Sequence, residues 1–262
     1  MNHNTQWDII KLSTSSLQSG DNIRIDCPFC GGKNTLSITR ILNNYVWNCY
    51  RSSCSTKGRK DTELTLSDLR NINKVQNREY VFKLPESFIS PIWHNEALDY
   101  MNRMHCLRAF EAGAVQIFYD PPRDRVVFIT TDMAGTVVDA NGRSMNKYAK
   151  PKWYRYGKAN LPFVCNRGRD TLVLVEDAPS ACAVFPDYTG MALQGTNVPL
   201  AAFKEIKEYK HVLVCLDPDA YKKSIEIRQK LAFIHNNVSA VFIPNDLKYF
   251  NQEEIKRILD DK

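Results

Sequence analysis

Four cysteines near the N-terminus have the spacing of a metal site. Two residues separate Cys27 from Cys30, four separate Cys49 from Cys54, and 18 lie between the two pairs. Two such pairs brought together by a hairpin supply the four thiolates that bind tetrahedral Zn²⁺, and they leave no coordination position open for catalysis. We therefore predict a structural zinc site. The alternatives are four unrelated buried thiols or two disulfides.

Acidic residues follow three of the expected strands where each strand ends. In a parallel sheet these ends meet at one edge, which is where ligands bind. Carboxylates crowded there repel one another unless a divalent cation neutralises them, and oxygen ligands suit Mg²⁺ or Mn²⁺. The pattern predicts a catalytic Mg²⁺ or Mn²⁺ site, unless each acid is only a capping or turn residue. The acids are Glu176 and Asp177 after residues 171–175, Asp217 and Asp219 after 211–216, and Asp246 after 239–243.

Residues 143–158 carry six cations in sixteen residues, interleaved with aromatic residues. Lysine and arginine neutralise phosphates and aromatic rings stack on bases, so this composition favours nucleic-acid and nucleotide binding. A solvated basic loop is the alternative. The cations are Arg143, Lys147, Lys150, Lys152, Arg155 and Lys158, and Trp153 is the largest of the aromatic residues among them.

The acids resemble the motif of the TOPRIM fold, which primases, topoisomerases and some nucleases share. Glu176 matches the family's glutamate, which acts in proton transfer or metal binding, and Asp217 and Asp219 match its metal-binding pair. The resemblance implies that these three residues are catalytic and bind magnesium, with Asp246 beside them as a further ligand. Three positions depart from the family: Asp177 and Lys222 replace glycines, and Ser180 replaces an acid.

The order of motifs along the chain is similar to that of bacterial and phage primases of the DnaG type. In these proteins an arginine-led strand, a hairpin glycine, a Gly-Arg step and a Pro-Lys-aromatic step come between a zinc ribbon and the TOPRIM glutamate. The matching residues here are Arg125, Gly135, Gly142-Arg143 and Pro151-Lys152-Trp153.

This resemblance implies a DNA primase, a DNA-directed RNA polymerase that makes short RNA primers from ribonucleoside triphosphates on single-stranded DNA. The ribbon would recognise a short start site on the template. Arg125 joins the basic residues named above as a nucleotide- or DNA-binding residue. No nucleotide-hydrolysing motif follows, so we expect a phage-type enzyme that works with a separate replicative helicase and DNA polymerase.

Alternating strands and helices position these residues. The predicted fold is an α/β TOPRIM-type domain over residues 169–262, after an α+β primase segment (81–168), a linker (61–80) and a β zinc ribbon (1–60). Alternation from residue 170 onward predicts a parallel sheet flanked by helices. The predicted strands are 22–26, 35–41, 45–48, 125–130, 136–140, 171–175, 190–193, 211–216 and 239–243, and the predicted helices are 66–71, 95–112, 179–185, 200–208, 221–236 and 252–259.

Composition is that of a globular protein, with 44% hydrophobic and 24% charged residues. The net charge of +6 permits a polyanionic partner without requiring one. The sequence contains no apolar run of membrane-spanning length and no signal-peptide core at its N-terminus, so we expect a cytoplasmic protein, in host cytoplasm if it is phage-encoded, with no membrane partner. In that reducing compartment paired cysteines hold metal more often than they form disulfides.

Two other functions use the same motifs. A TOPRIM domain also supports strand cleavage, as in metal-dependent nucleases and topoisomerase-like enzymes. A ribbon joined to such a domain could instead be a non-catalytic DNA-binding module of replication. Retention of the three catalytic acids argues against the module, and the few remaining residues argue against a strand-passing enzyme.

Overall fold

The computed structural model describes residues 3–17, 21–41, 44–62, 82–146, 148–159, 161–195, 197–199 and 201–260. The chain divides into two compact units, Met1–Arg78 and Glu79–Lys262, and each is described by itself. The helix predicted at 66–71, and nearly all of the linker predicted at 61–80, lie outside the described residues. No helix in the described part of the chain combines the length and the apolar character needed to cross a bilayer.

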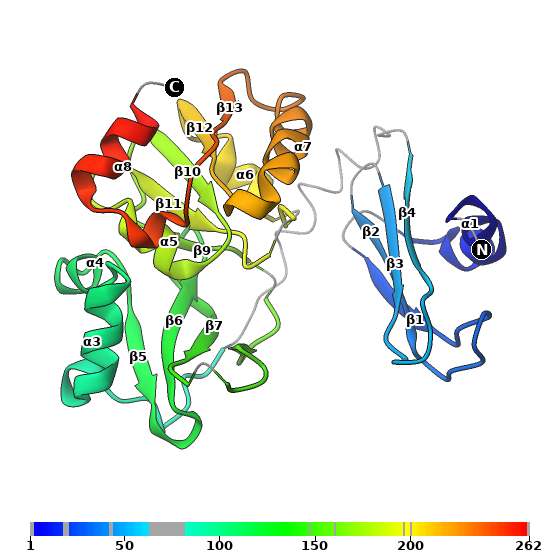
Figure 1. Ribbon diagram of the computed structural model, residues 1–262, viewed down its shortest axis with the longest axis horizontal. Helices are drawn as coiled ribbons and strands as arrows, with labels where there is room; N and C mark the ends of the chain where they lie inside the picture. The colour runs from blue at the N-terminus through cyan, green and yellow to red at the C-terminus, as the bar shows by residue number, and fades with distance from the viewer. Residues whose placement is uncertain are drawn as a thin grey trace. The chain divides into compact units, whose positions relative to one another are not determined.

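The N-terminal unit is one antiparallel sheet with a short helix against it. The four strands are hydrogen-bonded in the order β1-β2-β3-β4, so each pairs with its neighbour in sequence (Figure 1). The three predicted strands are confirmed, whereas neither the helix nor the fourth strand was predicted. The elements are α1 (His3–Ile10), η1 (Lys11–Thr14), β1 (Asn22–Ile25), β2 (Leu36–Ile41), β3 (Asn44–Cys49) and β4 (Lys57–Asp61).

Trp47 is the centre of this unit's core. Its side chain is 1% exposed, and its indole N–H donates to the Gln6 side-chain oxygen at 2.8 Å. Gly58 lies opposite on β4, and a Cβ there would overlap the Trp47 ring. Trp47 therefore packs the core rather than offering a free face to a nucleic-acid base.

The C-terminal unit contains two sheets, of which the first is antiparallel. Its strand order is β5-β6-β7-β8, and the hairpin predicted from 125–130 and 136–140 is its central pair. The helices α3 and α4 lie beside β5 (Figure 1). The elements are η3 (Pro91–Trp93), α3 (Asn95–Arg103), α4 (Leu107–Glu111), β5 (Ile117–Asp120), η4 (Pro121–Arg123), β6 (Arg125–Thr131), β7 (Val137–Ser144) and β8 (Trp153–Arg155).

The single helix predicted over 95–112 is wrong, because the chain forms α3 and α4 with a break between them. His105 has a φ of 55°, in the left-handed region that a continuing helix cannot contain. The Cys106 amide donates instead to the Met101 carbonyl at 2.8 Å and closes the turn.

The second sheet has the parallel core that the alternation predicts. Its strand order is β13-β12-β10-β11-β9, and every pair is parallel except β11 with β9. β9 lies inside the range predicted as the preceding segment, yet it is hydrogen-bonded into this sheet. The elements are β9 (Phe163–Cys165), β10 (Thr171–Val175), α5 (Ala178–Ala183), β11 (Thr189–Ala192), α6 (Ala202–Ile206), β12 (His211–Val214), η5 (Pro218–Ala220), α7 (Tyr221–Leu231), β13 (Val238–Ala240), η6 (Leu247–Tyr249) and α8 (Gln252–Leu259).

The strand order sets the positions of the acids. β10 and β12 are direct neighbours, with Leu174 opposite Val214, so the segments that leave them begin side by side. β13 pairs with the far side of β12 and runs in the same direction. The chain following all three strands therefore emerges at one edge of the sheet.

Helix α5 begins directly after Asp177. Gly190 on β11 sets how closely this helix packs against the sheet. A Cβ at Gly190 would overlap the backbone carbonyl of Ala181 on α5, and backbone cannot move aside as a flexible side chain could. We predict that Gly190→Ala lowers the free energy of unfolding of the C-terminal unit by about 2 kcal/mol, because the added methyl group overpacks this contact.

Urea denaturation of the full chain measures this effect. Ser239→Ala places the same residue type in strand β13 of the same sheet, where Ser239 is only half-buried, and should change the free energy of unfolding by less than about 0.5 kcal/mol. Equal stability of the two variants would contradict the close contact.

Candidate functional site

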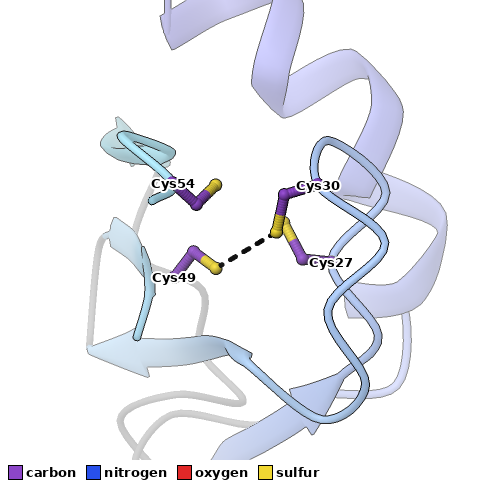
Figure 2. Close-up of side chains that lie close together, drawn as sticks. All are labelled: Cys27, Cys30, Cys49 and Cys54. Atoms are coloured by element: carbon purple, nitrogen blue, oxygen red, sulfur yellow. Dashed lines mark hydrogen bonds between the residues drawn. The ribbon is translucent and has the colours of Figure 1, made fainter. Parts of the chain in front are cut away.

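The four predicted zinc ligands come together in the N-terminal unit. Their sulfur atoms all lie within 4.8 Å of one another, and Cys30 Sγ is 3.8 Å from Cys49 Sγ. Figure 2 shows the sulfurs pointing inward, Cys27 and Cys30 from one turn and Cys49 and Cys54 from the segment opposite. Zn–S bonds of about 2.3 Å in a tetrahedron place the sulfurs roughly 3.8 Å apart, so the cluster fits zinc.

The surroundings of Cys27 and Cys54 give their thiols different pKa values. Burial raises the pKa of Cys27 to about 11, whereas hydrogen bonding to Thr56 lowers the pKa of Cys54 to about 6. All eight cysteines are free, so the two-disulfide alternative does not describe this structure. The other four cysteines are buried in the C-terminal unit, as small apolar residues often are.

Two of the three predicted catalytic residues, Glu176 and Asp217, line a cavity of about 470 Å³ in the C-terminal unit. Acidic, basic and aromatic residues all line it. Its lining residues are Asn141, Arg143, Lys152, Trp153, Arg155, Leu161, Glu176, Asp177, Ala178, Leu193, Gln194, Gly195, Pro199, Asp217, Asp246 and Lys248.

Strand ends deliver the acids to this cavity. Glu176 and Asp177 follow β10, and Asp217 follows β12, the adjacent strand. Asp246 also lines the cavity, whereas Asp219 is exposed and lies outside its lining. We refer to Glu176, Asp177, Asp217, Asp219 and Asp246 as the acidic cluster.

These carboxylates are close enough to oppose one another's ionisation. Burial raises the pKa of Glu176 above its ordinary value, and the charges of Asp177 and Asp219 raise it further. Burial, followed by the charges of Asp246 and Glu176, raises the pKa of Asp217 to about 7. The cluster therefore holds more negative charge than its surroundings neutralise, which is the condition that favours binding of a divalent cation.

The carboxylates are less tightly gathered than the thiols. Among the residues that the structure describes, the four cysteines are the only group of three or more Cys, His, Asp or Glu side chains whose ligand atoms are placed to hold one metal ion. Mutual repulsion keeps negative side chains apart, and a lysine also lies among them. The ammonium of Lys248 is 2.6 Å from a carboxylate oxygen of Asp177 and 2.6 Å from one of Asp246.

Asp177 also caps a helix, which is the alternative considered for these acids. Its Oδ1 accepts a hydrogen bond from the Ser180 amide at 3.0 Å and so satisfies the N-terminus of α5. Ser180 itself is buried, and Lys222 is exposed on α7. Of the three departures from the family motif, Asp177 is therefore the one that lines the cavity.

Four of the predicted nucleotide- or DNA-binding residues line the cavity, namely Arg143, Lys152, Trp153 and Arg155. β7 pairs with β8 and places Arg143 opposite Trp153, and the guanidinium lies 5.5 Å from the centre of the indole ring. This stretch is thus partly strand rather than a simple solvated loop. A cation held over an aromatic ring beside carboxylates suits a ligand with both a base and phosphates.

Arg125 lies elsewhere and holds backbone instead. It is 6% exposed, and its guanidinium donates to the carbonyls of Gly142 (3.1 Å), Pro151 (2.7 Å) and Lys152 (3.1 Å). These bonds join the strand that carries Arg143 to the segment that carries Lys152.

Two of the remaining basic residues do not line the cavity. Lys150 and Lys158 are exposed and lie outside its lining, and Lys147 lies outside the described residues. Arg155 reaches the cavity while paired with the fully buried Asp139 at 2.7 Å. Asp139 also accepts hydrogen bonds from the amides of Gly157 at 2.8 Å and Ala159 at 3.1 Å.

Asn141, Gln194 and Lys248 also line the cavity and were not predicted as site residues. Asn141 is 7% exposed, and its Nδ2 has no hydrogen-bond partner among the described residues, so it is a buried donor at the cavity. Its position two residues before Arg143, on the same strand face, was the signal available in the sequence. For Lys248, the only sequence feature that could have predicted a place at the site is its position two residues after Asp246.

Comparison with known proteins finds similarity among solved structures. No family model matches the chain, and no curated protein matches it. The primase of Aquifex aeolicus, with its zinc-binding and RNA polymerase domains, is 16% identical, with a TM-score of 0.47 over 97% of this chain and 83% of that one. The primase fragment of the bacteriophage T7 primase-helicase is 15% identical, with a TM-score of 0.49 over 91% and 98%.

The catalytic core of E. coli primase is similar over a shorter stretch. It is 15% identical, with a TM-score of 0.46 over 62% of this chain and 69% of that one. The chain is thus similar to solved structures of DnaG-type primases, the family that its motifs resemble.

We predict that the purified protein carries one zinc ion per chain. Cys49→Ser should abolish zinc binding and unfold the N-terminal unit, because folding of a small ribbon depends on its metal. Zinc released by thiol oxidation and measured with a chromogenic chelator tests this prediction. Cys215→Ala, which alters a buried thiol of the C-terminal unit, should leave the zinc content unchanged. Zinc-free protein with a folded N-terminal unit would contradict it.

We also predict that the acidic cluster binds Mn²⁺ more tightly as the pH rises to about 7. Its ligands must be carboxylates, and the pKa of Asp217 at about 7 means that this residue is mostly protonated below that pH. The affinity should rise about tenfold per pH unit below pH 7 and level off above it.

Electron paramagnetic resonance of free Mn²⁺ between pH 5.5 and 8.5 measures this affinity. Asp217→Asn should weaken binding and flatten the pH dependence. Asp170→Asn removes an exposed acid paired with Lys210 and should change neither. A constant affinity across this range would contradict the prediction.

Proposed function

We propose that this protein is a DNA primase of the DnaG type, which synthesises short RNA primers on single-stranded DNA from ribonucleoside triphosphates. The observation that carries the proposal is a single cavity that joins strand-end acids to Arg143, Lys152 and Trp153. Phosphoryl-transfer chemistry requires both: acids for divalent ions and cations for the phosphates. The motif order in the sequence supports the TOPRIM assignment of the acidic cluster.

In this proposal Glu176, Asp217 and Asp219 hold Mg²⁺ or Mn²⁺, with Asp246 beside them. The bound ion supplies charge neutralisation for the triphosphate and its pyrophosphate product. Glu176, at the end of β10 beside the other acids, would accept the proton from the attacking 3′-hydroxyl. That oxygen forms a bond to the α-phosphorus as the bond to pyrophosphate breaks.

The basic part of the cavity would hold the nucleotide and the template strand. Arg143 and Lys152 neutralise phosphates, and Trp153 offers an aromatic surface beside them. Asn141 adds a neutral donor with no protein partner among the described residues, suited to an acceptor on the ribose or base. Arg125 contributes indirectly, by holding the backbone of Lys152.

The wider assignments follow from the resemblance. The zinc ribbon would recognise a start site on single-stranded DNA. The enzyme would be phage-type, act in the cytoplasm and work with a separate helicase and DNA polymerase. The metal-dependent nuclease and the non-catalytic DNA-binding module remain the competing functions, since both would use the same acids or the same ribbon.

Primer synthesis on single-stranded DNA tests the proposal. We predict labelled RNA oligomers with wild-type protein and a loss of at least about a thousandfold for Asp217→Ala and Asp219→Ala, because electrostatic stabilisation of the transferring phosphate is lost. Asp170→Ala, at an exposed ion pair with Lys210, should retain full activity.

The products identify the competing functions directly. Template cleavage that needs Asp217 would indicate a nuclease. A shifted DNA band without RNA product or cleavage would indicate the binding module. Either result would overturn the primase assignment.

A further inference from the structure

Asn141 carries a hydrogen-bond donor at the wall of the cavity that the described part of the chain leaves without an acceptor. The side chain is 7% exposed, and its Nδ2 has no hydrogen-bond partner among the described residues. A buried amide donor in this state costs free energy, so folded proteins contain few of them. Because Asn141 lines the cavity, a bound ligand can supply the acceptor that the fold does not.

The position of Asn141 is fixed by the middle of a sheet. It lies on β7, which pairs with β6 on one side and β8 on the other, so that Asn141 has Phe128 and Arg155 as its cross-strand neighbours. Arg143 is two residues further along β7, so its side chain lies on the same face, and it lines the same cavity. The donor is therefore held beside a cation by a strand with partners on both sides.

The groups around Asn141 correspond to the parts of a nucleotide. The guanidinium of Arg143 lies 5.5 Å from the centre of the Trp153 ring, and its Nε also has no hydrogen-bond partner among the described residues. Arg155, opposite Asn141, is already paired with Asp139 at 2.7 Å. Arg143 can hold a phosphate and Trp153 can stack on a base. The sugar, which joins base to phosphate, is then the part left for the Asn141 donor.

We propose that Asn141 selects ribonucleotides, its Nδ2 donating a hydrogen bond to the 2′-hydroxyl oxygen of the nucleotide in the cavity. This inference rests on the proposed function, in which the cavity holds a ribonucleoside triphosphate. Asn141 is then a specificity residue, because it contacts the sugar and takes no part in the bond that forms or the bond that breaks.

The 2′-hydroxyl is the acceptor that suits a template-directed enzyme. The template decides which base enters, so a hydrogen bond to one kind of base would oppose the other correct nucleotides. The 2′-hydroxyl is common to all ribonucleotides and absent from deoxyribonucleotides, and it is the group by which proteins distinguish RNA from DNA. A site built to bind that hydroxyl rejects the analogue that lacks it, because the polar group of the site then stays unpaired.

Nucleotide binding to the zinc-loaded full chain, measured by isothermal titration calorimetry in Mg²⁺, tests the proposal. The wild type should bind ATP about tenfold more tightly than 2′-deoxy-ATP, which is the contribution of one hydrogen bond. Asn141→Leu keeps the size of the side chain and removes its amide. It should bind ATP about tenfold more weakly than the wild type does and 2′-deoxy-ATP equally well. Asn141→Ala, which cannot overpack the site, should give the same result if the leucine variant fails to fold.

Asn166→Ala is the matched control. Asn166 is another asparagine of the same unit, but its Nδ2 donates to the carbonyls of Pro186 at 2.9 Å and Tyr188 at 3.0 Å, and it lies outside the cavity's lining. This substitution should lower the stability of the unit and leave the preference for ATP intact. Loss of the preference in both variants would mean that it follows stability and not the Asn141 donor, and would overturn the proposal.

Other bases distinguish recognition of the sugar from recognition of the base. The preference lost in Asn141→Leu should be the same when GTP and CTP are compared with their 2′-deoxy forms. A change confined to one base, with either sugar, would show that Asn141 contacts the base. That result would overturn the proposal, as would an unchanged preference in Asn141→Leu or a wild type without any preference.

Calorimetry needs neither template nor primer synthesis, so the two assignments fail separately. Primer synthesis by a wild type whose preference does not depend on Asn141 would overturn this inference alone. A preference that depends on Asn141, in a protein that makes no primers, would overturn the primase assignment alone. A wild type that binds no nucleotide would overturn both.

Discussion

Repulsion among carboxylates at one edge of a parallel sheet is the constraint on which the C-terminal unit depends. The order of β10, β12 and β13, which run in the same direction, brings the acids that follow them to one edge of the sheet. The raised pKa values of Glu176 and Asp217 are the direct result of this crowding and of burial. Lys248 relieves part of this repulsion by pairing with Asp177 and Asp246, and Arg143, Lys152 and Arg155 line the same cavity.

The sequence predicted what depends on spacing and on strand direction. The four thiols follow from two short Cys pairs, and the acids follow from alternating strands and helices, because parallel strands must end at the same edge. These rules are local or topological and need no knowledge of side-chain packing. The same reasoning predicted the central hairpin but gave one helix over 95–112, since nothing in the apolar pattern marks the left-handed turn at His105.

Contacts between distant segments could not be predicted in this way. Lys248 meets Asp177 across 71 positions of sequence, and only the packing of η6 beside α5 makes them partners. Arg125 matched a motif position, but burial turns its guanidinium toward three carbonyls. The motif thus identified a structurally important arginine. Only the folded structure shows that Arg125 binds backbone carbonyls and does not line the cavity. The orphan amide of Asn141 likewise becomes visible only once its surroundings are known.

Arg125 and Asp139 together hold the described parts of the basic stretch at both of its ends. Arg125 binds the carbonyls of Gly142, Pro151 and Lys152. Asp139 binds the side chain of Arg155 and the amides of Gly157 and Ala159. A ligand entering the cavity thus meets cations that are already oriented, so little conformational entropy is lost on association. The two buried residues Arg125 and Asp139 therefore form a rigid frame that fixes the positions of the cavity's cations.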